Sequence, residues 1–383
     1  MTTRCFRPLL AFAPALLLAA GAHAGVLPDE RADALYKVYD GGGLQVEGPS
    51  VLVRKNFADK VSVTANWYVD QVSGASIDMV GLGASEIREE RTQKSLSLDY
   101  LRGKTTYTAG AQSTDENDYE GNTGFVSISQ DMFGDLTTVT LGASRGWDTI
   151  TDVGRPDFED DLERRTYSIG VSQVLTRNLI AGVDYEAITE QGFLQNPYRA
   201  IRYLSPDGST SIFAPEVYPR TRTSNAVAVR TKYFLPWRAS VSGRYRFFSD
   251  TWDIRAHTAE IGYTQPFLGD ALMADVSYRY YTQKAASFYS DLFPRENFQN
   301  FMARDKELSS NYNHSVGVAL SYDFLKNPGW RFLQRGSVSL HYDYIMYRFR
   351  DFRDASVTGV TPGTEPLYRY NANVAQLFVS VWF

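Results

Sequence analysis

The feature that most constrains this chain is a two-residue alternation of apolar and small polar side chains that recurs from end to end. Segments 316–324 and 338–344 carry Val, Leu, Tyr or Phe at every second position, with Gly, Ala, Ser, His or Asp between them. A period of two places each set on one face of a β-strand, because successive side chains of a strand point to opposite sides. No helical stretch is comparable, so we predict an all-β fold.

The connections between the predicted strands are short and long in turn. Short ones include 56–59 and 266–269, whereas long polar ones include 191–222 and 284–309. This alternation of short and long connections is typical of transmembrane barrels, which have short turns at one end and longer loops at the other. In such a barrel the apolar face meets lipid and the small polar face lines a wet lumen. A two-sheet sandwich would bury the apolar face, and it would not explain why short and long connections alternate.

The number of strands follows from the same pattern. Segments from Leu44 to Phe383 give about fifteen strands, and single-chain bacterial barrels have an even number. A short strand at Ala34–Asp40, turned by the three glycines that follow it, supplies one more. We therefore predict a transmembrane antiparallel up-and-down β-barrel of about 16 strands, with 14 or 18 as the alternatives.

The first residues have the features of a secretory signal peptide. A short basic start precedes an apolar run from Leu9 to Ala20, and a small-x-small pattern ends at Ala24. We expect residues 1–24 to be removed and residues 25–383 to form one barrel domain in the cell outer membrane. Removal takes away Cys5, the single cysteine, and leaves no thiolate for a metal site.

The remaining chain is acidic. Its 39 Lys and Arg fall to 37 when Arg4 and Arg7 leave, against 44 Asp and Glu, which gives a net charge of about −7. Nucleic-acid binders are usually basic, so we expect no nucleic-acid partner. The expected partners are outer-membrane lipids and lipopolysaccharide, the barrel-assembly machinery and periplasmic chaperones.

The last segment, 373–383, continues the alternation to an aromatic residue. Leu377, Val379, Val381 and Phe383 fall on its apolar face. Such an amphipathic strand resembles the signal by which the assembly machinery takes up barrel proteins, so we assign these four residues to assembly. The strand must also pair with the first one, because an open edge in hydrocarbon leaves N–H and C=O groups unsatisfied.

Charged residues at the polar positions of the strands are predicted to line the lumen. Basic ones gather on neighbouring strands, and acidic ones are predicted to face them, which resembles the transverse field of a porin constriction. The open alternative is that the basic residues pair locally, with acids such as Glu260 and Asp275, and fill a plugged barrel. The predicted basic wall is Arg230, Lys232, Arg238, Arg244, Arg246 and Arg279, and the predicted lumen acids are Asp99, Asp323 and Asp343.

Motifs for catalysis or metal binding are weak. The sequence GASRG at 142–146 matches a nucleophile-elbow pattern but lacks the strand–turn–helix context that the elbow requires. Acidic clusters at 115–120 and 159–163 lack the calcium-loop spacing with its glycine at the sixth position. We expect no enzymatic activity, no catalytic residue, no metal and no cofactor.

Several phrases of the chain resemble a family of exported bacterial proteins that is known only as a domain of unknown function. They are GPSVLVRKNFADKVSVTANWYVD, LDYLRGKTTYTAG, SQDMFGDLTTVTLGASRGWD, YPRTRTSNAVAVRTKYFLPW and YRFFSDTWDIRAHTAEIGY, spread over most of the chain. The resemblance implies an outer-membrane β-barrel with no settled activity. Relatives are often encoded near a periplasmic flavin transferase and a thioredoxin-like protein, which implies a link to redox or cofactor traffic.

Two functions are therefore open. The first is a porin-like channel for small hydrophilic solutes, with anionic solutes as the candidate class, because a barrel of this size leaves an aqueous channel unless loops fill it. The second is a non-conducting barrel that anchors or exports for a periplasmic redox or flavin-linked pathway and has a periplasmic partner.

Overall fold

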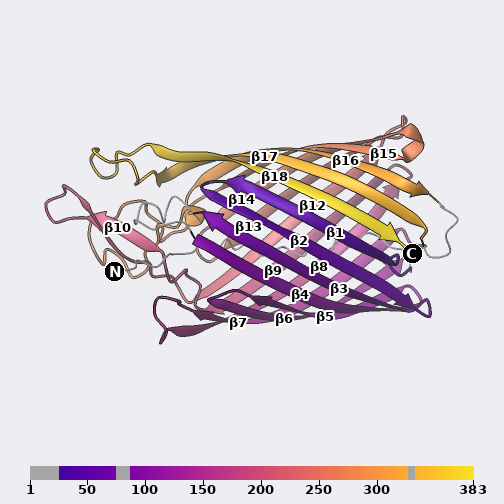
Figure 1. Ribbon diagram of the computed structural model, residues 1–383, viewed down its shortest axis with the longest axis horizontal. Coiled ribbons are helices and arrows are strands. Elements are labelled where there is room, and N and C mark those ends of the chain that lie inside the picture. Colours follow the sequence, from indigo (N-terminus) through magenta and orange to yellow (C-terminus); the bar gives the residue numbers. More distant parts are fainter. Residues whose placement is uncertain (1–25, 75–86, 327–332) are drawn as a thin grey trace.

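The computed structural model describes residues 26–74, 87–326 and 333–383, which form one closed antiparallel barrel of 16 strands (Figure 1). The predicted fold class and strand number are confirmed, whereas the predicted signal peptide lies outside the described residues. The barrel strands are β1 (Arg31–Gly41), β2 (Leu44–Phe57), β3 (Val61–Gly74), β4 (Ile87–Arg102), β5 (Thr105–Asp115), β6 (Tyr119–Met132), β7 (Thr137–Thr151), β8 (Glu159–Thr176), β9 (Leu179–Gly192), β12 (Thr221–Phe234), β13 (Ser240–Asp250), β14 (Arg255–Phe267), β15 (Leu272–Gln283), β16 (Asn311–Lys326), β17 (Arg335–Arg353) and β18 (Leu367–Trp382).

The first and last strands close the barrel. β1 pairs with β18 along its whole length, from Arg31 opposite Trp382 to Gly41 opposite Ala372, and with β2 on its other side. Gly42 and Gly43 join β1 to β2 at φ angles of 64° and 84°, values that a hairpin turn of two residues requires and glycine adopts without strain. The short strand predicted at Ala34–Asp40 therefore exists and is longer than expected.

An apolar belt covers the outside of the barrel. Val318 and Leu320 of β16 are 45% and 47% exposed, whereas Ser315 and Gly317 between such positions are buried or face the lumen. Exposed Val, Leu, Ile and Tyr recur at every second position of the other strands. This arrangement is stable when the outer surface meets lipid rather than water. Within the described residues, no helix is long and apolar enough to cross a membrane.

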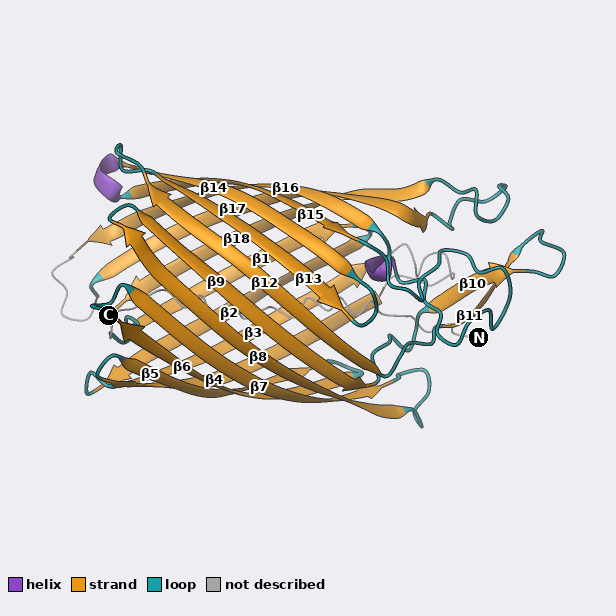
Figure 2. Cartoon of the chain, turned by 180° about the vertical axis from the view of Figure 1, so that it is seen from behind, coloured by secondary structure: helices purple, strands orange, loops and turns teal. Residues whose placement is uncertain are grey.

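The long connections lie at the end of the barrel opposite to the C-terminus (Figures 1 and 2). The segment between β9 and β12 contains a small hairpin, β10 (Ala200–Leu204) and β11 (Ser211–Pro215), which projects beyond the barrel. The segment between β15 and β16 contains the short helix η2 (Lys306–Leu308), and η1 (Leu268–Asp270) lies in a turn at the other end. We call residues 193–220, 284–310 and 354–366 together the cap.

The parts of the cap are held together by backbone pairing and an apolar core. Val217 pairs with Met302, and Tyr203 with Phe293, so the first two segments are joined like strands. The rings of Tyr218, Trp252 and Phe288 pack edge to face or tilted against one another, with ring centroids 5.1 to 5.6 Å apart. Because Trp252 belongs to the β13–β14 turn, this aromatic core fixes the cap to the barrel rim.

Candidate functional site

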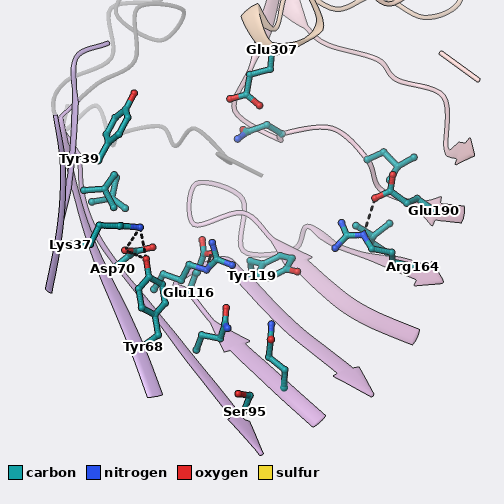
Figure 3. Close-up of a pocket in the computed structure, with 18 of the residues that line it drawn as sticks. Lys37, Tyr39, Tyr68, Asp70, Ser95, Glu116, Tyr119, Arg164, Glu190 and Glu307 are labelled. Carbon is teal, nitrogen blue, oxygen red and sulfur yellow. Dashed lines mark hydrogen bonds and ion pairs between the residues drawn. The ribbon is translucent and has the colours of Figure 1, made fainter. Parts of the chain in front are cut away.

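A cavity of about 1120 Å³ lies inside the barrel beneath the cap. Its walls come from inward-facing positions of strands around the barrel, and its roof from residues of the cap such as Gln195, Tyr218 and Glu307 (Figure 3). Most of the lining side chains are polar, charged or aromatic. The fold and this cavity define a β-barrel with an apolar outer belt and a cavity in its lumen that the cap covers at the long-loop end.

One side of the cavity carries a linked lysine, tyrosine and aspartate. Lys37 of β1 donates a hydrogen bond of 2.6 Å to the hydroxyl of Tyr68, which in turn donates to Asp70 of β3. The Lys37 ammonium lies 3.4 Å from the Asp70 carboxylate. Figure 3 shows these three side chains converging at the cavity wall. The ammonium is held in place by both partners and still lines the cavity.

Two further ion pairs line the neighbouring wall. Arg91 of β4 lies 3.4 Å from Glu116 in the β5–β6 turn, and Arg164 of β8 lies 2.9 Å from Glu190 of β9 (Figure 3). The Tyr119 side chain lies between these two pairs. The strands β3 to β9 thus present both signs of charge to the cavity.

The wall formed by β12 to β18 is different. Its charged lining residues among the described residues are all arginines: Arg222 of β12, Arg246 of β13 and Arg279 of β15. Arg222 stacks on Trp252 at 4.5 Å and Arg246 on Phe248 at 5.5 Å, which orients both guanidinium groups. Arg222 also forms an ion pair with Asp250 at 2.6 Å, so the excess positive charge of this wall is carried by Arg246 and Arg279. This wall faces a wall of mixed charge.

The predicted basic residues are placed as follows. Inward positions of the adjacent strands β12 and β13 carry Arg230, Lys232, Arg244 and Arg246, and Arg279 lies two strands further on β15. Arg246 and Arg279 line the cavity. Several are paired locally, as the alternative anticipated. The closest pairs are Arg230 with Asp184 at 2.5 Å and Arg246 with Glu186 at 3.6 Å.

Arg238 requires a correction. It does not lie on a strand but in the turn between β12 and β13, at a φ of 68°, and its side chain is 63% exposed. There it forms an ion pair with Asp270 of η1. The prediction failed because the strand alternation was carried two residues too far, through the turn that Pro236 begins.

The predicted acidic residues are only partly on the opposite wall. Asp99 of β4 lies across the barrel, lines the cavity and accepts a hydrogen bond of 2.7 Å from Thr108. Asp323 lies on β16, the neighbour of β15, and Asp343 lies on β17, one strand further, so both are on the side of the barrel that carries Arg279. Asp323 pairs with Arg335 at 3.0 Å near the other end of the barrel. The facing-wall prediction is wrong for these two residues.

The predicted assembly residues lie on the outer face of β18 or directly beyond it. Leu377 and Val379 are exposed, and Val381 follows them at the same parity. The ring of Phe383 lies 5.1 Å from the Lys55 ammonium. Their role in assembly stays a prediction.

The roof of the cavity contains a buried carboxylate. Glu216, 2% exposed, accepts hydrogen bonds from the Arg304 backbone N–H at 2.6 Å and from the Tyr218 hydroxyl at 2.8 Å. Burial and the nearby charge of Asp305 raise the pKa of Glu216 to about 7, although Arg199 opposes the shift. The roof therefore holds a group that titrates near neutral pH.

Three carboxylates, from Glu89, Glu116 and Asp118, have oxygens within 4.8 Å of one another at the cavity wall. Arg91 lies 3.4 Å from Glu116 and already supplies a positive charge to the group. The arrangement is a mixed charge cluster, and it does not change the expectation that the protein holds no metal.

The comparison with protein families agrees with the resemblance read from the sequence. Residues 155–335 match the family described as "Protein of unknown function (DUF3570)". The phrases YPRTRTSNAVAVRTKYFLPW and YRFFSDTWDIRAHTAEIGY fall inside this range, and the other three lie before it. No curated protein matches the chain.

Solved structures match the barrel over nearly its full length. A structure described as "Bacterial polysaccharide outer membrane secretin" has 8% identity and a TM-score of 0.52, with 93% of this chain and 99% of that one covered. OccK1 (OpdK) of Pseudomonas aeruginosa has 10% identity and a TM-score of 0.45, covering 93% and 100%. OmpT of Vibrio cholerae has 10% identity and a TM-score of 0.42, covering 92% and 98%. At 8% identity, the secretin match shows a shared outer-membrane barrel fold and nothing of activity.

Proposed function

We propose that the protein is an outer-membrane channel for small hydrophilic solutes, with its outer mouth covered by the cap. The observation that carries this proposal is the cavity of about 1120 Å³ inside the barrel, which is lined by charged, hydroxyl and aromatic side chains as well as apolar ones. An interior filled by packed apolar side chains would leave no path for a solute, whereas this one offers charged and hydroxyl groups to it.

The cationic wall of Arg222, Arg246 and Arg279 supports anionic solutes as the preferred class. Charges in a cleft with low-dielectric walls focus their field and raise the local concentration of the opposite ion. The acids Asp184, Glu186 and Asp250 weaken the effect, because they form ion pairs with Arg230, Arg246 and Arg222. We therefore expect a modest anion preference rather than strict selection.

The test is conductance in planar bilayers, with and without the cap hairpin. β9 and β12 pair directly, with Gln191 opposite Thr221, so residues 197–216 can be replaced by a short Gly–Ser linker without opening the barrel wall. The channel proposal expects rare or small unitary steps for the intact chain and larger, stable steps for the deletion variant. Absence of conductance from both proteins, with normal heat-modifiable folding, would contradict it.

The cap gives specific support to the second function, a closed barrel that serves as anchor or export component for a periplasmic pathway. Buried ion pairs and an aromatic core fasten the roof, and many lumen charges are paired. This function expects both proteins to remain closed and a defined periplasmic protein to co-purify with the barrel. Neither version of the proposal assigns catalysis to the cavity.

A further inference from the structure

A group of basic residues lies on the outside of the barrel at the end that carries the long loops. Four lie at the loop ends of β14, β17 and β18, and the fifth directly follows β15. Their outward direction follows from parity, because they share a face with exposed apolar residues such as Ile261, Tyr342 and Leu377. The residues, which we call the rim cations, are Arg255, Lys284, Arg348, Arg350 and Arg369.

The rim cations lie on neighbouring strands rather than being scattered. His257 is opposite Thr282, Thr282 opposite Tyr312, Tyr312 opposite Arg348 and Arg348 opposite Arg369, which is one continuous row across five strands. Lys284 donates its backbone N–H to Arg255, and Arg350 donates to Ser310, which extends the row beyond the strand pairs. The basic surface is therefore contiguous.

Two of these side chains are held in position. The Arg348 guanidinium donates to the Tyr347 carbonyl at 2.7 Å and to Asn371 at 3.1 Å. The Arg350 guanidinium lies 5.0 Å over the ring of Tyr312. Among the described residues, no carboxylate lies within 4.0 Å of any rim cation. Positive charge is thus concentrated without local compensation.

An aromatic tier lies between the rim cations and the aliphatic belt. His314 accepts or donates a 2.7 Å hydrogen bond with Tyr278, and His257 does the same with Tyr245 at 2.6 Å. The ring of Tyr280 lies 5.1 Å from that of His314. Aromatic residues of this kind lie at the level of lipid headgroups.

The opposite side of the same rim is different. There the outward-facing Glu163 of β8 binds Arg145 at 2.8 Å and Arg165 at 2.7 Å, so the basic residues are neutralised by a carboxylate. The basic residues of this cluster are therefore compensated, whereas the rim cations are not, which favours a ligand on the β14–β18 side.

We propose that the rim cations bind the phosphate groups of an anionic outer-leaflet glycolipid of the lipopolysaccharide type. This inference rests on the proposed location in the outer membrane. Arginine forms charge-assisted hydrogen bonds with phosphate oxygens. The acyl chains would lie along the exposed Ile261, Val276 and Val318, directly below the aromatic tier. A soluble phosphate would gain nothing from that belt, so the committed ligand is a lipid.

The experiment measures binding of fluorescent diphosphorylated lipid A to the refolded full chain in uncharged maltoside micelles. Arg350→Gln with Arg369→Gln should weaken binding about thirtyfold, because each Arg near an anionic lipid surface contributes about a fivefold factor. The matched control is Arg145→Gln with Arg165→Gln, which removes the same charge from the opposite side. It should change binding less than about twofold, because these residues are already paired with Glu163.

Heat-modifiable migration shows whether each variant has folded, and Arg255→Gln with Lys284→Gln repeats the test from β14 and β15 if the first variant does not fold. Equal losses in the test and control variants would overturn the proposal. So would equal binding of dephosphorylated lipid A, or displacement by an equal concentration of inorganic phosphate. If the protein conducts but binds the lipid unselectively, this inference fails and the channel proposal stands. If it binds the lipid selectively but does not conduct, the channel proposal fails and this inference stands.

Discussion

Arg202 and Glu365 form a buried ion pair although they are 163 residues apart, with Arg202 Nη1 2.5 Å from Glu365 Oε1. The Arg202 side chain is 1% exposed and also binds Asp291. The pair joins β10 to the segment between β17 and β18, and Asp291 adds the segment between β15 and β16. One guanidinium thus links all three parts of the cap.

The first prediction concerns this link. Arg202→Met should loosen the cap and leave the barrel intact, because removing one partner of a buried ion pair typically costs about 3–5 kcal/mol. We expect faster protease cleavage within residues 193–220 and more frequent open events in bilayers, with unchanged heat-modifiable migration of the barrel.

Arg295→Gln is the matched control, because Arg295 lies in the same cap but is exposed. It has long hydrogen bonds of 3.4 Å to backbone carbonyls and lies 5.7 Å from the centroid of the Phe298 ring. It should be cleaved at the rate of the unchanged protein. Identical cleavage of both variants would show that Arg202 does not fasten the cap.

The second prediction concerns pH. Burial raises the pKa of Glu216 to about 7 from an ordinary 4.5, so the folded cap favours the protonated acid. The stabilising contribution is complete below pH 4.5 and is lost as pH rises through 7, because the Glu216 carboxyl then ionises and becomes a buried charge. It amounts to on the order of 3 kcal/mol at most. Cap cleavage should therefore be slower at pH 5.5 than at pH 8.5.

Glu216→Gln should remove this dependence, because the amide stays neutral at both pH values while it fills the same space. Asp207→Asn is the control: hydrogen bonds from Ser205 and Ser209 lower the pKa of Asp207 to about 2, outside the window. A pH dependence that persists in Glu216→Gln would assign the effect to another group.

Much of the barrel could be predicted because lipid enforces a simple rule on every strand. Residues of the outer face that lie within the hydrocarbon layer are apolar, so the period of two is visible without knowledge of the partners. Strand number followed from parity, and closure from the need to satisfy the edges. The inward direction of Arg246 and Arg279 follows from the same alternation.

The cap and the charge pairs could not be predicted in the same way. Arg202 and Glu365 form an ion pair although they are 163 positions apart, and the local sequence around one residue does not indicate that the other is its partner. Asp323 and Asp343 were assigned to the wrong wall because their distance from the basic residues around the ring depends on strand order over the whole circumference. Lys37, Asp70 and Arg164 were missed as lining residues, although their inward parity was visible.

The third prediction concerns the direction of side chains on β16. Val318→Arg should destabilise the barrel by about 2–4 kcal/mol, because it places a charge in the apolar belt. Ser321→Arg should cost much less, since Ser321 has the opposite parity and faces the lumen. Urea unfolding in lipid vesicles measures both. Equal costs would show that the two positions do not face different environments.

The fourth prediction concerns selectivity. In the variant with residues 197–216 replaced by the linker, Arg246→Glu with Arg279→Glu should move the reversal potential in a salt gradient toward cation preference. Both residues line the cavity, and the double change reverses the sign of the wall they share. The shift should shrink at 1 M salt, where the screening length is about 3 Å.

Arg238→Glu tests whether position rather than net charge is responsible for that shift. Its side chain lies in an exposed turn beside Asp270, outside the lumen, so the reversal potential should stay where it is in the parent variant. Equal shifts from Arg238→Glu and from the double variant would mean that the total charge of the barrel, and not the arginine wall, sets the ion preference. An unchanged reversal potential in the double variant would mean that Glu186 and nearby acids already neutralise the positive charge of the arginine wall. The proposed anion preference would then be wrong.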